Sequence, residues 1–289
     1  METRDIRRQV RSLARDFARA GVDSPRLSAE LILATALGMD RQDLLRELLL
    51  RPERPLSPAE ESLLRRLAAR RAAGEPAAYI TGRREFFGRD FLVTPAVLIP
   101  RPETELLVET ALAGSARQGV LADFGTGSGC IVLSLALEMP GWRCLGLDRS
   151  REALAVARAN AAALGAARAV FVLADFSRPP LLPRSLDLLA GNPPYVSGAE
   201  YRRLSREIRN FEPRAALVPG GDEAGGQEAL DAIMDQAALF LRPGGRLLLE
   251  IGQTQEREAL ARLRPEDWAK AEVLRDLAGR PRLLAAARR

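Results

Sequence analysis

The stretch that decides the fold is "VLADFGTGSGCIVLSLALE", residues 120–138. "VLADF" predicts a short buried strand, "GCIVLSLALE" predicts a helix, and three glycines separate them: Gly125, Gly127 and Gly129. Glycines at such a junction let the backbone turn tightly and approach a ligand closely. The first N–H groups of the helix have no partner inside it and can donate to that ligand. The stretch therefore predicts a ligand-binding turn between the first strand and the first helix of an α/β domain.

The same alternation of strand and helix continues along the chain. Apolar runs predict further strands at residues 143–148, 169–175, 186–192 and 245–251. Helical patterns occupy residues 150–165 and 226–241. Continuously apolar strands that alternate with helices are typical of a parallel sheet covered by helices on both faces. We therefore predict a doubly wound, mostly parallel α/β sheet in residues 101–289.

Residues 1–75 have a helical pattern instead. Apolar residues spaced four, three and four positions apart form one face of a first helix: Ile6, Val10, Leu13 and Phe17. Ser24 is expected to cap a helix that starts at Pro25. Ser57 and Glu60 have the spacing of a capping box. This domain gathers no chemically active side chains, so we predict that it recognises a substrate.

Residues 76–100 are predicted to form a β-hairpin connector. "EFFGRDFLV", residues 85–93, alternates apolar and polar positions around Gly88-Arg89, as the two strands of a hairpin do. "TPAVLIPRPETELLVETAL" then leads through prolines into another helix.

The composition excludes several kinds of site. The chain has no histidine, so no histidine base or metal ligand is available. Cys130 and Cys144 lack the spacing of metal ligands, so no metal site is expected. Both lie in apolar runs and are predicted to be buried in a reducing compartment, which indicates the cytoplasm. No apolar run reaches the length of a membrane span. The net charge of +5 permits a nucleic-acid partner without requiring one.

The spacing of the glycine loop narrows the choice of ligand. The loop follows G-x-G-x-G, whereas a dinucleotide fingerprint requires G-x-G-x-x-G, and this chain has Cys130 at the last position. Asp148 ends the second strand about 20 residues after the loop, where a carboxylate suits the two hydroxyls of a ribose. The alternative is that Asp148 caps the helix that begins beside Ser150.

The end of the third strand adds a possible adenine site. Asp175 closes the strand and Phe176 follows, so an adenine ring can lie against the phenyl ring. Packing of Phe176 in the core is the alternative. Together with the loop, these features fit an adenosine ligand without a pyrophosphate, and S-adenosylmethionine is the commonest such ligand.

The fourth strand ends in "LDLLAGNPPYVS", residues 186–197. Ligands of open α/β sheets bind at the carboxyl ends of strands, so Asn192 is expected beside the glycine loop. The Asn192 side-chain oxygen and the Pro193 carbonyl can both accept from one planar NH2 group, and Tyr195 can stack on its plane. The alternative is a strand exit that Pro193 and Pro194 merely stiffen.

Two such acceptors suit a planar amide or aniline-type nitrogen that acts as a nucleophile. The lone pair of that nitrogen is delocalised, and no ordinary base removes its proton at neutral pH. Acceptors aimed at its hydrogens favour a pyramidal nitrogen and stabilise the positive charge that grows as a methyl group arrives. The motif therefore predicts methyl transfer to a planar NH2 group without a metal or a histidine.

Nearly the whole chain resembles the release factor glutamine methyltransferase family. The NPPY motif is similar to the signature of methyltransferases that act on planar amino nitrogens. The stretches that carry the wider resemblance are "EPAAYITGRREFFGRDFLVTPAVLIPRPETELLVE" (75–109), "DFGTGSGCIVLSLA" (123–136), "NPPYVS" (192–197), "FEPRAALVPGG" (211–221) and "LRPGGRLLLEIGQTQ" (241–255).

The resemblance implies methylation, from S-adenosylmethionine, of the glutamine side-chain amide in the Gly-Gly-Gln motif of peptide chain release factors. It implies the Rossmann-like fold of class I methyltransferases and a five-helix N-terminal domain that helps to hold the protein substrate. It also implies a set of cofactor contacts: Gly125, Thr126, Gly127, Ser128, Gly129, Asp148, Phe176 and Asn192. The glutamine would be held by Asn192, Pro193, Pro194 and Tyr195. We expect a monomer whose partner is a release factor, with no membrane and no nucleic-acid substrate.

Two features depart from the family pattern. A compact GG-x-DG turn corresponds here to the longer "PGGDEAGGQEAL", residues 219–230, and Phe176 stands where some relatives have tryptophan. The chain also contains its own Gly225-Gly226-Gln227. A chance occurrence in a loop before a helix is the main interpretation, and self-methylation is the alternative.

Three other functions stay open. A ribosomal-protein glutamine methyltransferase would share the catalytic core. An adenine-specific nucleic-acid methyltransferase also uses a planar amine, but it should add a basic, aromatic recognition face, and residues 1–75 contain one aromatic, Phe17. A non-catalytic adaptor would not need an intact glycine loop, Asp148 and NPPY.

Overall fold

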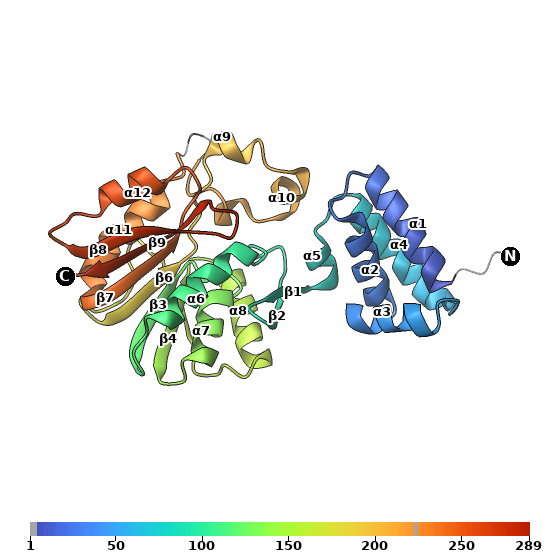
Figure 1. The fold of residues 1–289 in the computed structure, drawn as a ribbon, viewed down its shortest axis with the longest axis horizontal. Helices are drawn as coiled ribbons and strands as arrows, with labels where there is room; N and C mark the ends of the chain where they lie inside the picture. Colours follow the sequence, from blue (N-terminus) through green and yellow to red (C-terminus); the bar gives the residue numbers. More distant parts are fainter. Residues whose placement is uncertain (1–4, 222, 224) are drawn as a thin grey trace. The chain divides into compact units, whose positions relative to one another are not determined.

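The computed structural model describes residues 5–221, 223 and 225–289, which form two compact units (Figure 1). The first unit extends to Arg83 and also includes Ser205–Phe211. The second contains Arg84–Leu204 and Glu212–Arg289. The boundary expected from the sequence, at residue 75, lies before this one, and a later segment of the chain folds with the N-terminal helices.

The first unit is a bundle of short helices. They are α1 (Ile6–Arg19), α2 (Pro25–Ala36), α3 (Arg41–Leu50), α4 (Pro58–Ala72), α5 (Ala77–Thr81) and α10 (Arg206–Phe211). The predicted apolar face of α1 is confirmed, because its four residues are buried in the core of this unit: Ile6, Val10, Leu13 and Phe17. The predicted capping box of Ser57 and Glu60 at the start of α4 is also confirmed.

The predicted cap of α2 is wrong. The helix begins at Pro25, but Ser24 has a left-handed backbone, with φ 49° and ψ 58°, and its side chain makes no hydrogen bond to the helix. An N-cap residue normally has an extended backbone, which brings its oxygen to the N–H groups of the first turn. Pro25 can start the helix without this help, because its ring already fixes φ near the helical value.

One buried arginine holds α10 in the first unit. Arg71, near the end of α4, is 3% exposed and donates to Glu207 Oε2 on α10 over 2.9 Å. It also donates to Ser28 Oγ (3.2 Å) and to the Glu75 carbonyl (2.7 Å). A buried charge is tolerated when it is paired and its donors are used. The short α10 is therefore held by the N-terminal helices, although it lies far from them in the sequence.

A seven-stranded sheet, in the order β5-β4-β3-β6-β7-β9-β8, forms the centre of the second unit. Five of its strands are parallel: β3 (Gly119–Phe124), β4 (Trp142–Asp148), β5 (Val170–Leu173), β6 (Leu186–Gly191) and β7 (Leu241–Glu250). One face packs on α6 (Glu105–Ala113), α7 (Cys130–Glu138) and α8 (Arg151–Ala163), and the other on α11 (Glu228–Phe240) and α12 (Glu256–Arg262). The predicted doubly wound, mostly parallel sheet is confirmed.

Two C-terminal strands were not predicted. β8 (Trp268–Arg275) and β9 (Pro281–Arg288) pair antiparallel, and β9 also pairs antiparallel with β7. Pro281 is compatible with this position because it is the first residue of its strand. β8 carries exposed charged residues at the edge of the sheet, so it lacks the continuous apolar run that marks the parallel strands.

The hairpin of the second unit has a different turn from the one predicted. Its strands are β1 (Arg83–Phe86) and β2 (Arg89–Leu92), so the turn residues are Phe87 and Gly88 rather than Gly88 and Arg89. Both have positive φ, 51° and 70°, as a two-residue type I′ turn requires. The left-handed Phe87 is supported by a hydrogen bond from its N–H to Glu105 Oε1 (2.9 Å).

The hairpin packs into the core of the second unit through Phe86 and Phe91, whose ring centroids lie 6.0 Å apart. The remaining elements are α9 (Gly198–Tyr201) and the 3-10 helices Pro102–Thr104 and Arg214–Ala216. No helix in the described part of the chain is long and apolar enough to cross a membrane.

Candidate active site

The carboxyl ends of the parallel strands surround one pocket in the second unit. β3 has β4 on one side and β6 on the other, so the strand order reverses direction between β3 and β6. Open α/β sheets bind ligands at such a switch point. The loops after β3, β4, β5 and β6 contribute Gly125, Thr126, Gly127, Ser128, Asp148, Arg149, Ser150, Phe176, Asn192 and Pro194. The predicted edge is therefore the edge at which the pocket lies.

The glycine loop is shaped by its own backbone. Gly125, Gly127 and Gly129 have φ of 75°, 55° and 82°, a region that disfavours residues with a Cβ atom. The N–H groups of Gly125 and Thr126 both donate to the Leu147 carbonyl over 2.9 Å. Gly129 is not among the pocket-lining residues, and a Cβ there would lie 3.3 Å from the Cβ of Ala157 on α8, so this glycine allows the start of α7 to approach α8 closely.

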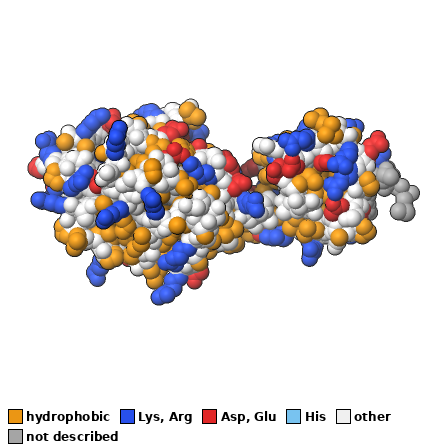
Figure 2. All heavy atoms as spheres, turned by 90° about the horizontal axis from the view of Figure 1, so that it is seen from below, with side chains coloured by type: hydrophobic (Ala, Val, Ile, Leu, Met, Phe, Trp, Pro, Cys, Tyr) orange, Lys and Arg blue, Asp and Glu red, His pale blue; other side chains and the backbone are white. Residues whose placement is uncertain are grey.

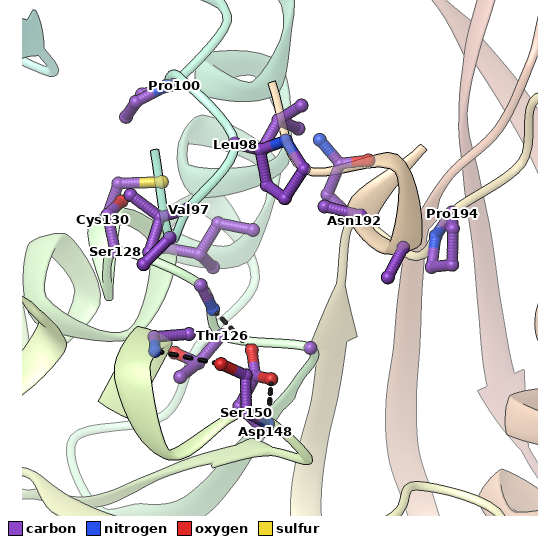
Figure 3. A pocket seen from close by; sticks show the side chains of 18 of the residues that line it. Val97, Leu98, Pro100, Thr126, Ser128, Cys130, Asp148, Ser150, Asn192 and Pro194 are labelled. Carbon is purple, nitrogen blue, oxygen red and sulfur yellow. Dashed lines mark hydrogen bonds between the residues drawn. The ribbon is translucent and has the colours of Figure 1, made fainter. Parts of the chain in front are cut away.

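Asp148 lies at the pocket and does not supply the cap of α8. It lines the pocket, and its carboxylate accepts from the N–H groups of Gly127 and Ser150, each over 2.9 Å (Figure 3). The cap of α8 is the Ser150 hydroxyl, which accepts from the Ala153 N–H over 3.0 Å. A carboxylate has about four acceptor positions, so two remain on Asp148 for a ligand after these bonds.

Asp123 was missed by the sequence analysis. It is fully buried at the end of β3, where Oδ2 accepts from the Thr126 hydroxyl (2.6 Å) and Oδ1 has no partner among the described residues. Burial raises the pKa of Asp123 to about 7. The signal was an acidic residue in an otherwise apolar strand, directly before the glycine loop. Asp123 is not among the pocket-lining residues, so its unpaired oxygen is a buried feature next to the glycine loop.

Phe176 and Cys130 both reach the pocket. Phe176 lines it and also packs against the core on one face of the sheet, so core packing is confirmed and the contact with adenine stays a prediction. Asp175 is not among the pocket-lining residues, and its carboxylate accepts from the Ser177 N–H. Cys144 is buried as predicted, whereas Cys130 is only half-buried because its side chain lines the pocket. Burial raises the pKa of the Cys130 thiol to about 12, so it stays neutral.

The NPPY residues divide between the pocket and the interior behind it. Asn192 and Pro194 line the pocket, whereas Pro193 is buried and Tyr195 is half-buried, and neither is among the lining residues. The Asn192 Nδ2 donates to Thr104 Oγ1 over 3.2 Å. The Tyr195 hydroxyl donates to Glu250 Oε1 over 3.0 Å, and burial together with Glu250 raises the pKa of Tyr195, so the hydroxyl keeps its proton.

The close approach at Gly191 explains how Asn192 reaches the glycine loop. A Cβ at Gly191 would lie 2.8 Å from the carbonyl oxygen of Phe124, the last residue of β3. Only glycine therefore lets β6 end so close to the turn that follows β3. The geometry brings the acceptor motif and the glycine loop to opposite sides of the same switch point.

The segment before α6 forms a further wall of the pocket, although the sequence analysis expected it only to connect the hairpin to a helix. The segment before α6 contributes Ala96, Val97, Leu98, Pro100, Arg101 and Thr104, and in Figure 3 its labelled residues lie on the side away from Asp148. The Arg101 guanidinium is held by the buried Glu212 over 2.6 Å. Another loop adds Pro213, Ala215, Ala216 and Pro219. Residues 222 and 224 of the "PGGDEAGGQEAL" stretch lie outside the described residues.

The sheet, the glycine loop and the strand-end acceptor define a class I, S-adenosylmethionine-dependent methyltransferase. Family profiles match the chain at residues 10–82 (PrmC N-terminal domain) and 102–224 (Methyltransferase small domain). The chain is 50% identical over 276 residues to the release factor glutamine methyltransferase of Nitratidesulfovibrio vulgaris, covering 93% of this chain and 90% of that protein. It is 42% identical over 267 residues to the one of Koribacter versatilis, covering 92% of each. The chain belongs to the release factor glutamine methyltransferase family.

The residues of the pocket fit the cofactor of this class. Asp148 keeps two free acceptor positions, as the hydroxyls of a ribose need. Phe176 offers a flat apolar surface for a purine. Asp148, Phe176 and the glycine loop are the groups that would hold S-adenosylmethionine.

Proposed function

We propose that this protein methylates the side-chain amide nitrogen of the glutamine in the Gly-Gly-Gln motif of peptide chain release factors. The observation that carries the proposal is a free acceptor at the pocket: Asn192 Oδ1 has no hydrogen-bond partner among the described residues. A glutamine amide offers two N–H donors that such an acceptor can hold. The names of the relatives point to the same substrate.

Asn192 and Pro193 supply acceptors for the two amide hydrogens. No described group donates to the Pro193 carbonyl, and the proline ring keeps this part of the backbone rigid. Two acceptors favour a pyramidal nitrogen and stabilise the positive charge that develops on it. Bound S-adenosylmethionine supplies an electrophilic methyl group on sulfur. The glutamine nitrogen would take this methyl group as the carbon–sulfur bond breaks, S-adenosylhomocysteine would be left as the by-product, and the nitrogen would then lose one proton to solvent.

The apolar wall of the pocket limits the access of water to this reaction. Val97, Leu98 and Pro100 form one side, and Phe176 belongs to another. Electrostatic interactions strengthen where water is excluded, so each acceptor stabilises the growing charge more than it would in bulk solvent.

We also propose that the helical first unit recognises the protein substrate, and that the enzyme acts as a monomer in the cytoplasm. The charges of this unit support a protein partner over a nucleic acid. Figure 2 shows acidic side chains among the basic ones on its visible face. Several of its arginines are paired with acids: Arg26 and Arg41 with Glu30, Arg46 with Asp43, and Arg70 with Glu75. A nucleic-acid site would instead present clustered, unpaired basic residues.

The test is to incubate the protein with methyl-labelled S-adenosylmethionine and separate pools of release factor, ribosomes, tRNA and DNA. We expect label in the release factor alone. A release factor whose motif glutamine is replaced by glutamate, which lacks the amide, should stay unlabelled. Label in ribosomes or nucleic acid, with none in the release factor, would contradict the proposal.

A further inference from the structure

A buried hydrogen-bonded network lies behind the pocket wall and connects three distant segments. Thr104, before α6, donates through Oγ1 to Glu250 Oε2 at the end of β7 over 2.5 Å. The Tyr195 hydroxyl donates to the other oxygen of Glu250, Oε1. Asn192 Nδ2 donates to Thr104 Oγ1. Thr104 and Glu250 are each only 2% exposed, so water does not compete for these bonds.

The protons of this network can be assigned from its chemistry. The Thr104 hydroxyl has a single proton, and in the ionised form of Glu250 it donates that proton to Oε2 and accepts from Asn192 Nδ2. The amide must therefore present Nδ2 to Thr104 and leave Oδ1 as its free atom. This argument does not depend on distinguishing the oxygen and nitrogen of an amide by position alone.

The same carboxylate holds both ends of the NPPY motif. Glu250 binds Tyr195 directly and Asn192 through Thr104, and the two rigid prolines lie between these anchored ends. Burial raises the pKa of Glu250, while the two donated bonds and the Arg282 guanidinium, 4.0 Å from Oε1, favour its ionised form. Fixing both ends of a rigid four-residue segment fixes the direction of its side chains and carbonyls.

We infer that Thr104 and Glu250 are positioning residues, which hold the Asn192 amide with its oxygen, not its nitrogen, free to accept from the substrate nitrogen. The inference rests on the proposed function. Neither residue needs to touch the substrate amide. Without the Glu250 acceptor, Thr104 could donate to Asn192 Oδ1, and the amide would turn its NH2 group toward a substrate NH2 group. Two donors would then face each other, and the acceptor would be lost.

The test compares four variants in single-turnover methyl transfer to release factor at saturating S-adenosylmethionine. Thr104→Val keeps the shape of the side chain but removes the hydroxyl, and Thr104→Ser restores the hydroxyl. Glu250→Gln introduces an NH2 group that can donate to Thr104. Thr110→Val is the matched control, because its hydroxyl donates only to the Leu106 carbonyl within α6.

We expect Thr104→Val and Glu250→Gln to lower the rate about 10- to 100-fold, since small misplacements of reacting groups have effects of this size. Thr104→Ser and Thr110→Val should stay within about threefold of the parent rate. A threefold change is less than the 1.4 kcal/mol that corresponds to a tenfold change. S-adenosylmethionine affinity and melting temperature should change little in Glu250→Gln, which conserves volume.

A folded Thr104→Val with the parent rate overturns the inference, as does a Thr104→Ser variant as slow as Thr104→Val. If Thr104→Val does not fold, Glu250→Gln decides, and a parent-like rate in that variant overturns the inference. A merely structural role would lower cofactor affinity, stability and rate together, which also overturns it. A parent protein that labels no release factor is a different result, because it overturns the proposed function and with it the inference.

Discussion

The two sides of the pocket are built in different ways. On the glycine-loop side, the backbone of Gly125 and Thr126 bonds to the neighbouring strand, and Asp148 bonds to Gly127 and Ser150 within the two adjacent loops. On the acceptor side, Asn192 bonds to Thr104, and both Thr104 and Tyr195 bond to Glu250. The partners in these bonds lie 55 to 146 positions apart in the chain. The loop side therefore depends on local backbone geometry, and the acceptor side depends on long-range side-chain contacts. The comparison predicts that the two sides can be damaged separately.

The largest expected effect concerns Asp123, beneath the glycine loop. Burial raises the pKa of its carboxyl to about 7, well above the value near 4 of an unfolded chain. Between about pH 4 and pH 7 the unfolded chain has lost this proton and the native protein keeps it, so stability falls as the pH rises. By this shift, ionisation of Asp123 lowers the free energy of unfolding by on the order of 4 kcal/mol at most, since each pKa unit corresponds to 1.36 kcal/mol.

Asp123→Asn should remove this contribution, because its side chain does not ionise. Urea unfolding of both proteins without cofactor, from pH 4.5 to 7.5, measures it. We expect the parent to lose stability relative to the variant across this range and the difference to level off above pH 7. Parallel stability curves would show that Asp123 titrates normally.

The second prediction concerns Asp148 and damages only the glycine-loop side of the pocket. Asp148→Ala removes the acceptors proposed for the ribose and should weaken S-adenosylmethionine binding by about 1–3 kcal/mol. Isothermal titration measures the affinity, and transfer at saturating cofactor should fall much less. Asp235→Ala is a control, because Asp235 is an exposed carboxylate on α11 that pairs with Arg262. Unchanged affinity in Asp148→Ala would remove Asp148 from the cofactor site.

The smallest expected effect concerns Tyr195, on the acceptor side of the pocket. Tyr195→Phe keeps the ring but removes the hydroxyl that donates to the buried Glu250, a loss of about 1–3 kcal/mol in stability. We expect a several-fold slower transfer and an unchanged cofactor affinity. Tyr195→Leu also removes the ring, so a further loss of rate in that variant supports the predicted stacking on the substrate amide. Equal rates in the two variants would argue against stacking.

The difference between the two sides also explains what could be predicted from the sequence. The glycine loop is encoded by adjacent residues, so its position between β3 and α7 and its place at the pocket followed from "ADFGTGSGC". The parallel strands were recognisable because burial on both faces makes them continuously apolar. Asn192 was placed at the right edge of the sheet because the carboxyl ends of parallel strands meet there.

The remaining features depend on contacts that no local pattern contains. Thr104 and Glu250 meet only in the folded protein, where α6 lies against β7 and Arg246 of β7 donates to the carbonyls of Thr110 and Ala111. The edge strand β8 has no apolar run, and α10 is bonded to the first unit by Arg71, which lies far from it in the sequence. The left-handed Phe87 places a bulky residue where a hairpin turn normally has glycine or asparagine, so the turn was predicted one residue too late.

The most direct test of the central claim is single-turnover methyl transfer by Asn192→Ala at saturating S-adenosylmethionine, with release factor as the acceptor. Loss of one hydrogen bond to the developing charge should lower the rate about 10²- to 10³-fold, while cofactor affinity and melting temperature change much less. Asn160→Ala is the matched control, because that buried amide bonds only to the backbone of Leu92 and Ser128 and should lose stability instead. If Asn192→Ala transfers methyl within a few-fold of the parent rate, Asn192 is not the acceptor and the account is wrong.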